Sequence, residues 1–238
     1  MTSYATTVQE SAAPYGRSIA RTNASERRVI LHGVSWDTYK ALSKDLGEDT
    51  HCRLAFDSGD LEIISPQSHR HGKTEYRIGN LVSILAEELG LECEGAGHMT
   101  CEREDVQKAI EPDGCFYIQH AHVIEGLDSI DLTIHPPPDL MIEVDISTHS
   151  MKKLGICAAL GVPEHWRYDG EILEIRNLKD GRYFESKESL AFPRLPLTEK
   201  IPEMLKLKTG DAISMIREFR AWVRGELRKA KSKRPRKR

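Results

Sequence analysis

The residues with the clearest potential for chemistry are acids at or within apolar, strand-like segments. Asp113 and Asp139 each follow a proline and each precede such a segment. In the run from Asp139 to Asp145, the alternation of side chains along a strand places Asp139, Glu143 and Asp145 on one face. Acids in so apolar a strand are costly to bury unless they are paired, hydrogen-bonded or bound to a cation. A hard divalent cation such as Mg²⁺ is one solution, and solvation at the strand ends or pairing with arginine is the other.

Other chemistries receive less support from the sequence. His69 and His71, like His120 and His122, stand two residues apart, but no third ligand follows at a spacing typical of zinc sites, so we expect loop or surface histidines. The chain contains no GxSxG, GxGxxG or Walker motif, which argues against a serine hydrolase and against nucleotide cofactors. Its five cysteines are widely spaced and include no CxxC pair, as expected of reduced thiols.

The elements that must position these acids follow from periodicity. Ser35 is a candidate cap for a helix that ends near Gly47, and a hairpin turns at residues 57–59. The strongest helix carries an apolar stripe from Ile78 to Leu89. Strand-like segments follow at 91–95, 99–103 and 115–119, and the apolar run at 139–145 is typical of a central strand buried on both faces. A helix at 149–160 then precedes an antiparallel meander at 162–186. This order predicts an α/β (α+β) fold in which helices flank a mixed sheet.

Composition limits the class of protein. In 238 residues, 39% are hydrophobic and 30% are charged, and no apolar run is long enough for a membrane helix. The N-terminal segment has no apolar signal-like stretch, so we expect a cytoplasmic protein. Residues 228–238 hold eight Lys or Arg; without these, 26 basic residues face 37 acidic ones. We expect a disordered lead-in at 1–28, a folded domain at 29–204, an amphipathic helix at 205–227 and a disordered basic tail at 228–238.

Several segments together resemble the Uma-type restriction endonuclease family (DUF820), within the PD-(D/E)xK superfamily. They are GVSWDTYKAL, RLAFDSGDLEIISP, His71 before the long helix, EPDGCFYIQ, PPDLMIEVDIS and GVPEHWRYDGEILEI, in this order from Gly33 to Pro196. The resemblance implies a restriction-endonuclease-like core, in which a mixed sheet carries a Pro-Asp element followed by an acid-x-Lys element.

Site residues follow from the same resemblance. It implies Asp113 as the first metal ligand and Glu143 as the second. The lysine expected two residues after Glu143 is replaced by Asp145, which could extend the metal site, and Lys153 on the next helix matches a migrated lysine. Two further acids are weaker candidates, namely Asp139 as a ligand or supporting acid and Glu75 as the helical acid of many such nucleases.

The function implied is Mg²⁺- or Mn²⁺-dependent hydrolysis of phosphodiester bonds, with nucleic acid, and DNA first, as substrate. A homodimer is expected to suit double-strand cleavage, and no membrane partner is expected. The alternative is a catalytically silent module that keeps the fold for binding nucleic acid or protein. Two features favour the alternative: the absence of a lysine at position 145, and the excess of acidic over basic residues outside the basic tail. The joint presence of Asp113, Glu143 and Lys153 favours the enzyme.

Overall fold

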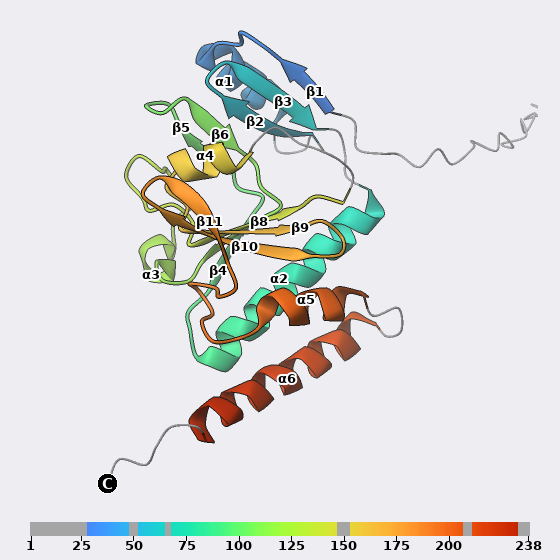
Figure 1. Ribbon diagram of the computed structural model, residues 1–238. Coiled ribbons are helices and arrows are strands. Elements are labelled where there is room, and N and C mark those ends of the chain that lie inside the picture. The colour runs from blue at the N-terminus through green and yellow to red at the C-terminus, as the bar shows by residue number, and fades with distance from the viewer. Residues whose placement is uncertain (1–27, 48–51, 65–67, 147–152, 207–210, 233–238) are drawn as a thin grey trace, which may run out of the picture.

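A computed structural model describes residues 28–47, 52–64, 68–146, 153–206 and 211–232. Its strands form two sheets, and the helices lie against and between them (Figure 1). The expected α+β class, with a mixed sheet and flanking helices, is confirmed. None of the described helices combines the length and the apolar composition that a membrane span needs. All five cysteines are free thiols, as expected.

The larger sheet has six strands in the order β11-β10-β9-β8-β7-β4. Its central strand β8 pairs in parallel with β9 and antiparallel with β7, which makes the sheet mixed. All five residues of β8 are buried, so the prediction of a central strand is confirmed. The strands are β4 (Glu94–Gly97), β7 (Gly114–Tyr117), β8 (Leu140–Val144), β9 (Glu164–Tyr168), β10 (Leu173–Lys179) and β11 (Arg182–Ser186).

One face of this sheet is covered by the long helix α2 (His69–Leu89), which Ser68 caps. The predicted stripe of α2 packs against Leu140, Ile142 and Val144, the side chains of β8 that point to this face. Helix α5 (Leu197–Lys206) contacts α2 and β10, and α6 (Ala212–Ser232) packs against α2 on the side away from the sheet (Figure 1). Because α6 extends to Ser232, the first residues of the expected disordered tail are helical; residues 1–27 and 233–238 lie outside the described chain.

The smaller sheet has five strands in the order β1-β3-β2-β6-β5. It contains the predicted hairpin, and helix α1 (Trp36–Leu46) packs on it through a cluster that includes Trp36, Tyr39 and Phe56. As predicted, α1 is capped by Ser35, whose hydroxyl accepts a hydrogen bond from the Thr38 amide. The strands are β1 (Arg28–Leu31), β2 (Arg53–Asp57), β3 (Asp60–Ile64), β5 (Cys101–Arg103) and β6 (Lys108–Ile110).

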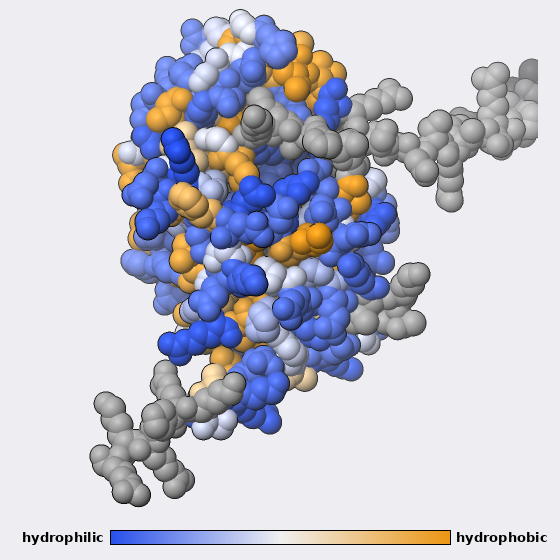
Figure 2. All heavy atoms as spheres, in the orientation of Figure 1, coloured by the Kyte–Doolittle hydropathy of each residue, from blue (hydrophilic) through white to orange (hydrophobic). Residues whose placement is uncertain are grey.

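Helix α4 (Lys153–Ala159) lies between the two sheets, where it contacts β2 and β6 on one side and β11 on the other. Its Ile156 and Cys157 share one apolar cluster with Met141 of β8 and Ile110 of β6. Side chains of β8 therefore alternate between α2 on one face and α4 on the other. Figure 2 shows a hydrophilic surface with smaller hydrophobic patches on this side of the molecule.

Some elements were not predicted, namely β1, β6, α5 and the short helix α3 (Ala121–Ile124). Strand β6 lies in a stretch that looks polar in sequence, but Ala109 and Ile110 are buried in it. Only three residues long, it follows a turn at Gln107, whose φ is 55°. Such short strands carry too little periodicity to be predicted, because their pairing partners supply the stability.

Candidate active site

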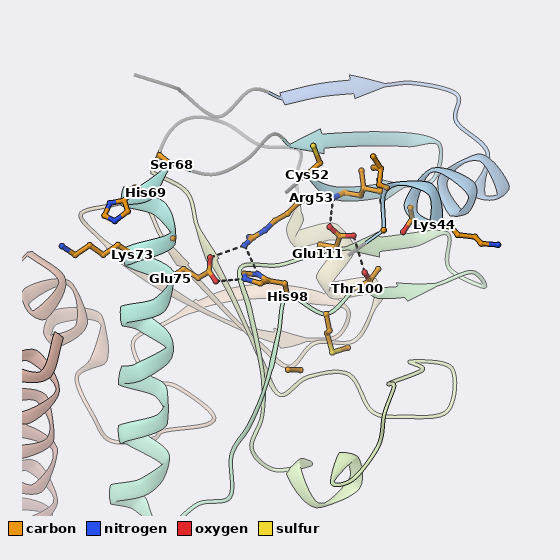
Figure 3. Close-up of a pocket in the computed structure, with 17 residues that line it drawn as sticks. Lys44, Cys52, Arg53, Ser68, His69, Lys73, Glu75, His98, Thr100 and Glu111 are labelled. Carbon is orange, nitrogen blue, oxygen red and sulfur yellow. Dashed lines mark hydrogen bonds and ion pairs between the residues drawn. The ribbon is translucent and has the colours of Figure 1, made fainter. Parts of the chain in front are cut away.

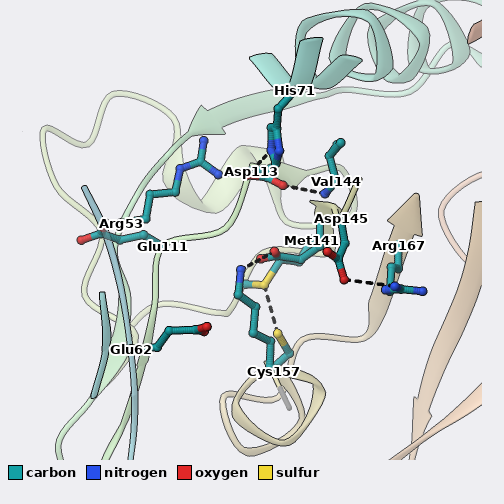
Figure 4. Close-up of polar contacts among 12 residues, drawn as sticks. Arg53, Glu62, His71, Glu111, Asp113, Met141, Val144, Asp145, Cys157 and Arg167 are labelled. Atoms are coloured by element: carbon teal, nitrogen blue, oxygen red, sulfur yellow. Dashed lines mark hydrogen bonds and ion pairs between the residues drawn. The ribbon is translucent and has the colours of Figure 1, made fainter. Parts of the chain in front are cut away.

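Asp113 and Glu143 lie at adjacent positions on neighbouring strands. The register of β7 and β8 pairs Gly114 with Ile142, so the next residues along each strand are Asp113 and Glu143. The backbone amide of Val144 donates to Oδ2 of Asp113 at 2.5 Å (Figure 4). Asp113 is 3% exposed and Glu143 is 6% exposed. The structure thus places the two acids that we expected as metal ligands next to each other.

Two residues of the first turns of α2 meet Asp113. His71 and Glu75 are four residues apart and therefore project from one face of the helix. His71 Nε2 lies 3.1 Å from Asp113 Oδ1 (Figure 4), and one potential ligand atom from each of the three residues falls within 4.8 Å of the others. Glu75, the weaker candidate, is therefore part of this group. Glu143 is not.

His71 differs from the expectation of loop or surface histidines, because it is buried on a helix. His69 and His122 are exposed, as expected. The separating feature is helical spacing: His71 shares a face with Glu75 and with the apolar stripe that begins at Ile78, and His69 does not. Because the helix begins directly after Ser68, its first turn carries His71 onto the face of the apolar stripe.

Glu143 is held by the lysine of the neighbouring helix. Lys153 Nζ, at the start of α4, lies 2.5 Å from Glu143 Oε2, and both side chains are largely buried. The other oxygen, Oε1, is buried and makes no hydrogen bond to any residue that the structure describes. A buried carboxylate oxygen without a donor is costly, so this side of Glu143 is suited to receive a cation.

Asp145 is engaged by two arginines. Its Oδ2 accepts a hydrogen bond from Arg167 Nη2 at 3.0 Å (Figure 4), and its Oδ1 lies 3.8 Å from Arg28 Nη2. Arg28 Nη1 also lies 3.6 Å from Glu62 of β3, which is fully buried. Asp145 therefore has counter-charges of its own. The pattern did not identify Arg28 or Glu62, although Glu62 carries the same signal as Glu143, an acid within an apolar strand.

Asp139 lies at the other end of β8 and makes a different set of contacts. It accepts hydrogen bonds from the backbone amides of Ile118 and His120 at 2.7 and 2.9 Å, and Nδ1 of His120 lies 2.6 Å away. Glu143 is four positions further along the strand, which is about 13 Å at about 3.3 Å per residue. The structure does not bring Asp139 together with Asp113 and Glu143.

A cleft of about 1230 Å³ opens beside His71, Glu75 and Asp113, which we call the Asp113 group (Figure 3). Arg53, Glu75 and His98 meet in its wall: Arg53 Nη2 lies 3.2 Å from Glu75 Oε2 and 2.9 Å from His98 Nδ1. Glu111, of the EPD segment, also lines the cleft and accepts a hydrogen bond from the Leu54 amide. Burial raises the pKa of Glu111 above its usual range, although this amide lowers it.

The donor set fits a divalent cation. It offers carboxylate oxygens from Asp113 and Glu75 and an imidazole nitrogen from His71. Glu143, outside this group, follows Ile142 on the neighbouring strand and has one oxygen that lacks a hydrogen bond within the described chain. Carboxylates suit Mg²⁺ and Mn²⁺, and an imidazole ligand is more usual with transition metals. Lys153 supplies a cation beside the same strand end.

Comparison with known proteins identifies a family. Residues 36–209, 174 of the 238, match the family model Uma2, described as "Putative restriction endonuclease". This match confirms the resemblance found in the sequence. A crystal structure described as "a putative nuclease belonging to DUF820", from Anabaena variabilis ATCC 29413, aligns with 80% of this chain and 99% of its own, at 13% identity and a TM-score of 0.46. No curated protein matches the chain.

Proposed function

The chain belongs to the Uma2 family of restriction-endonuclease-like proteins, and from this premise we propose that it is a divalent-metal-dependent endonuclease that hydrolyses phosphodiester bonds of DNA. Asp113 and Glu143 hold the metal, Mg²⁺ or Mn²⁺, and Lys153 is the accompanying cation. Hydrolysis of a phosphodiester needs an activated water and stabilisation of extra negative charge on the phosphate. A bound metal ion would supply both, by acidifying a water molecule and polarising the phosphate.

The observation that carries this proposal is the pairing of Asp113 with Glu143 at one strand end, with Lys153 against Glu143. The fold holds each group in place. The Val144 amide fixes one oxygen of Asp113, His71 contacts the other, and the β7–β8 register fixes the spacing of the acids. Lys153 neutralises Glu143 in the metal-free protein and stays close enough to contact a phosphate held at the same strand end.

Asp145 has a separate role in this proposal. With Arg167 and Arg28 as partners, its charge is balanced inside the protein, so it neither needs a metal nor leaves an uncompensated negative charge near the phosphate. In this proposal metal binding therefore rests on Asp113 and Glu143, and His71 and Glu75 lie beside Asp113.

A catalytically silent module is the second candidate. The observation that favours it is Asp145 itself, which stands where the resemblance implies a lysine and is tied into ion pairs. A silent module keeps the same fold and acidic site but makes no metal-dependent cut in any nucleic acid.

Calorimetry with Mn²⁺ and Mg²⁺ tests the site, and cleavage of supercoiled plasmid DNA tests the activity. We expect Asp113→Asn and Glu143→Gln each to abolish metal binding and to reduce cleavage by about 10²–10³-fold. Asp105→Asn, at an exposed acid paired with Arg103, is the matched control and should behave as the wild type.

Three results decide between the candidates. Metal binding with cleavage supports the endonuclease. Metal binding without cleavage of DNA or RNA supports the silent module. Unchanged metal affinity in Glu143→Gln contradicts the assignment of Glu143 as a ligand, whatever the activity.

A further inference from the structure

Arg53 stands among the carboxylates of the Asp113 group. It is the first residue of β2, and its side chain is 13% exposed. Its guanidinium forms an ion pair with Asp113. It also pairs with Glu75 and contacts His98 in the wall of the cleft (Figure 3). A guanidinium carries its charge at all relevant pH values. The two carboxylates therefore already have a cation within the protein.

The same two carboxylates belong to the group that could hold a metal ion. Two carboxylates balance one divalent cation, but with Arg53 between them the net charge available to a metal falls to about −1. A guanidinium and a metal ion held by the same oxygens would also repel each other strongly at such short range. Pairing of Arg53 with Asp113 and Glu75 therefore opposes the binding of a metal ion to the same carboxylates.

We propose that Arg53 is a built-in competitor of the metal ion, which occupies Asp113 and Glu75 in the metal-free protein and is released into the adjoining cleft to contact a nucleic-acid phosphate when metal binds. This inference rests on the proposed function, because it takes the Asp113 group as the metal site and nucleic acid as the substrate. It adds Arg53 as the residue that links metal binding to contact with the nucleic-acid phosphate.

The cleft is suited to receive both the guanidinium and a phosphate. Arg53 already lines it, so its side chain borders the space that a phosphate would enter. Lys44 of α1 and Lys73 of α2 line the cleft on opposite sides, and both side chains extend outward in Figure 3. Both are exposed, and neither forms an ion pair with a described residue. Of the acids that line the cleft, Glu75 is paired and Glu111 is engaged by the Leu54 amide.

The chemistry of the ligand follows from these groups. An arginine recognises a phosphate with two parallel hydrogen bonds, and flanking lysines add charge without a fixed direction. The cleft is larger than the ~300–1,000 Å³ typical of small-ligand sites, so it has room for more than one nucleotide. It therefore fits the backbone of a nucleic-acid strand next to the phosphate that is cut.

The first test is metal affinity. Removal of a competing cation should tighten Mn²⁺ binding in Arg53→Gln by about tenfold, the scale on which a charge at this distance acts on a neighbouring site. Arg53→Lys keeps the charge and should bind Mn²⁺ nearly as the wild type does. Arg103→Gln, at a surface ion pair on β5 of the same sheet, is the matched control and should change nothing. Thermal unfolding of each variant verifies that it is folded.

The second test is DNA binding without cleavage. In a Lys153→Met background, the anisotropy of a short fluorescent duplex is measured with and without Mn²⁺. We expect Arg53→Gln to weaken binding several-fold when Mn²⁺ is present and to have little effect when it is absent, because in the metal-free protein Arg53 is held by the acids. Lys44→Gln and Lys73→Gln should weaken binding in both conditions.

The outcomes separate this inference from the proposed function. Unchanged or weaker Mn²⁺ binding in folded Arg53→Gln overturns the competition, even if the wild type binds metal and cuts DNA. Equal DNA affinity of Arg53→Gln and its parent in Mn²⁺ overturns the release into the cleft. Mn²⁺ binding by Arg53→Gln but not by the wild type supports the competition most strongly. Absence of binding in both overturns the inference and the proposed metal site together.

Discussion

The two ends of strand β8 carry acids of opposite character. Asp139, just before the strand, accepts hydrogen bonds from two backbone amides and lies against His120. Glu143, near the other end, contacts Lys153 and has one buried oxygen without a hydrogen bond inside the described chain. Both are almost fully buried, and both are implied by the same strand pattern. Burial of an acid therefore does not distinguish a structural role from a functional one, and Asp139 and Glu143 differ instead in how completely their oxygens are hydrogen-bonded.

Glu164 on the neighbouring strand β9 supports this distinction. It is fully buried and accepts hydrogen bonds from the Trp166 indole and from the amides of Leu190 and Ala191. These donors tie β9 to the segment that precedes α5. Like Asp139, Glu164 uses its charge to satisfy buried backbone amides, and it leaves no oxygen for a ligand.

The largest expected effect is a loss of stability on replacement of Asp139, which tests its structural role. Replacement by Ala leaves the buried amide of Ile118 without an acceptor, which we expect to cost about 3 kcal/mol of unfolding free energy. Mn²⁺ affinity should not change. Urea unfolding and calorimetry measure the two quantities, and Asp131→Ala, at an exposed acid that accepts hydrogen bonds from the Thr133 amide and hydroxyl, is the control. If a folded Asp139→Ala protein loses metal affinity, Asp139 takes part in metal binding and the structural assignment is wrong.

A second prediction asks whether an unsatisfied buried group must be functional. His165 of β9 is buried, neither ring nitrogen has a hydrogen-bond partner among the described residues, and burial lowers its pKa to about 3. Since an unfolded histidine has a pKa of about 6.5, the unfolded chain takes up the proton first on acidification. Stability should thus be full above about pH 6.5 and fall between 6.5 and 3 by about 1.4 kcal/mol per pH unit.

The measurement compares urea midpoints near pH 7.5 and pH 5 for the wild type and His165→Phe. The wild type should lose about 2 kcal/mol more than the variant over this interval. His122→Gln, at an exposed histidine, should retain the wild-type pH dependence. Metal affinity should be the same in all three proteins, because His165 lies on a strand face packed in the core. A metal-binding defect in His165→Phe would mean that its missing partners do mark a site.

The smallest expected effect concerns Glu143 and Lys153 together. Replacement of a buried ion pair by uncharged side chains of similar size is often neutral or stabilising. Glu143→Gln combined with Lys153→Met should therefore keep the wild-type unfolding free energy within about 1 kcal/mol and lose metal binding. A large loss of stability in the double variant, measured by urea unfolding, would assign the pair a structural role like that of Asp139.

The sequence predicted those parts of the fold that are encoded locally. The stripe of α2, the cap at Ser35 and the apolar run of β8 were identified because each pattern is long or carries a specific signal. Strand β6 and helix α5 were missed. The first is three residues long, and the second contains Pro202, which obscures a helical pattern.

The candidate site was predicted where it lies along one strand and missed where it depends on contacts between distant segments. Asp113, Glu143 and Lys153 were placed by their motifs, and the structure brings them to one strand end. The partners of Asp145 and Asp139 could not be predicted, because Arg28 is 117 positions from Asp145 in the chain and the amides around His120 approach Asp139 only after β7 and β8 pair.

The contact between Arg28 and Asp145 has a consequence for how such sequences can change. Arg28 lies in β1, before residue 36, where the match to the family begins, whereas Asp145 lies in the matched core. A lysine at 145 would place a second cation against Arg28, and an uncharged residue at 28 would leave Asp145 and Glu62 with less compensation. Substitutions at positions 28 and 145 are therefore expected to occur together. Relatives with lysine at 145 are expected to lack arginine at 28. A variant of this protein that introduces lysine at 145 must therefore also replace Arg28.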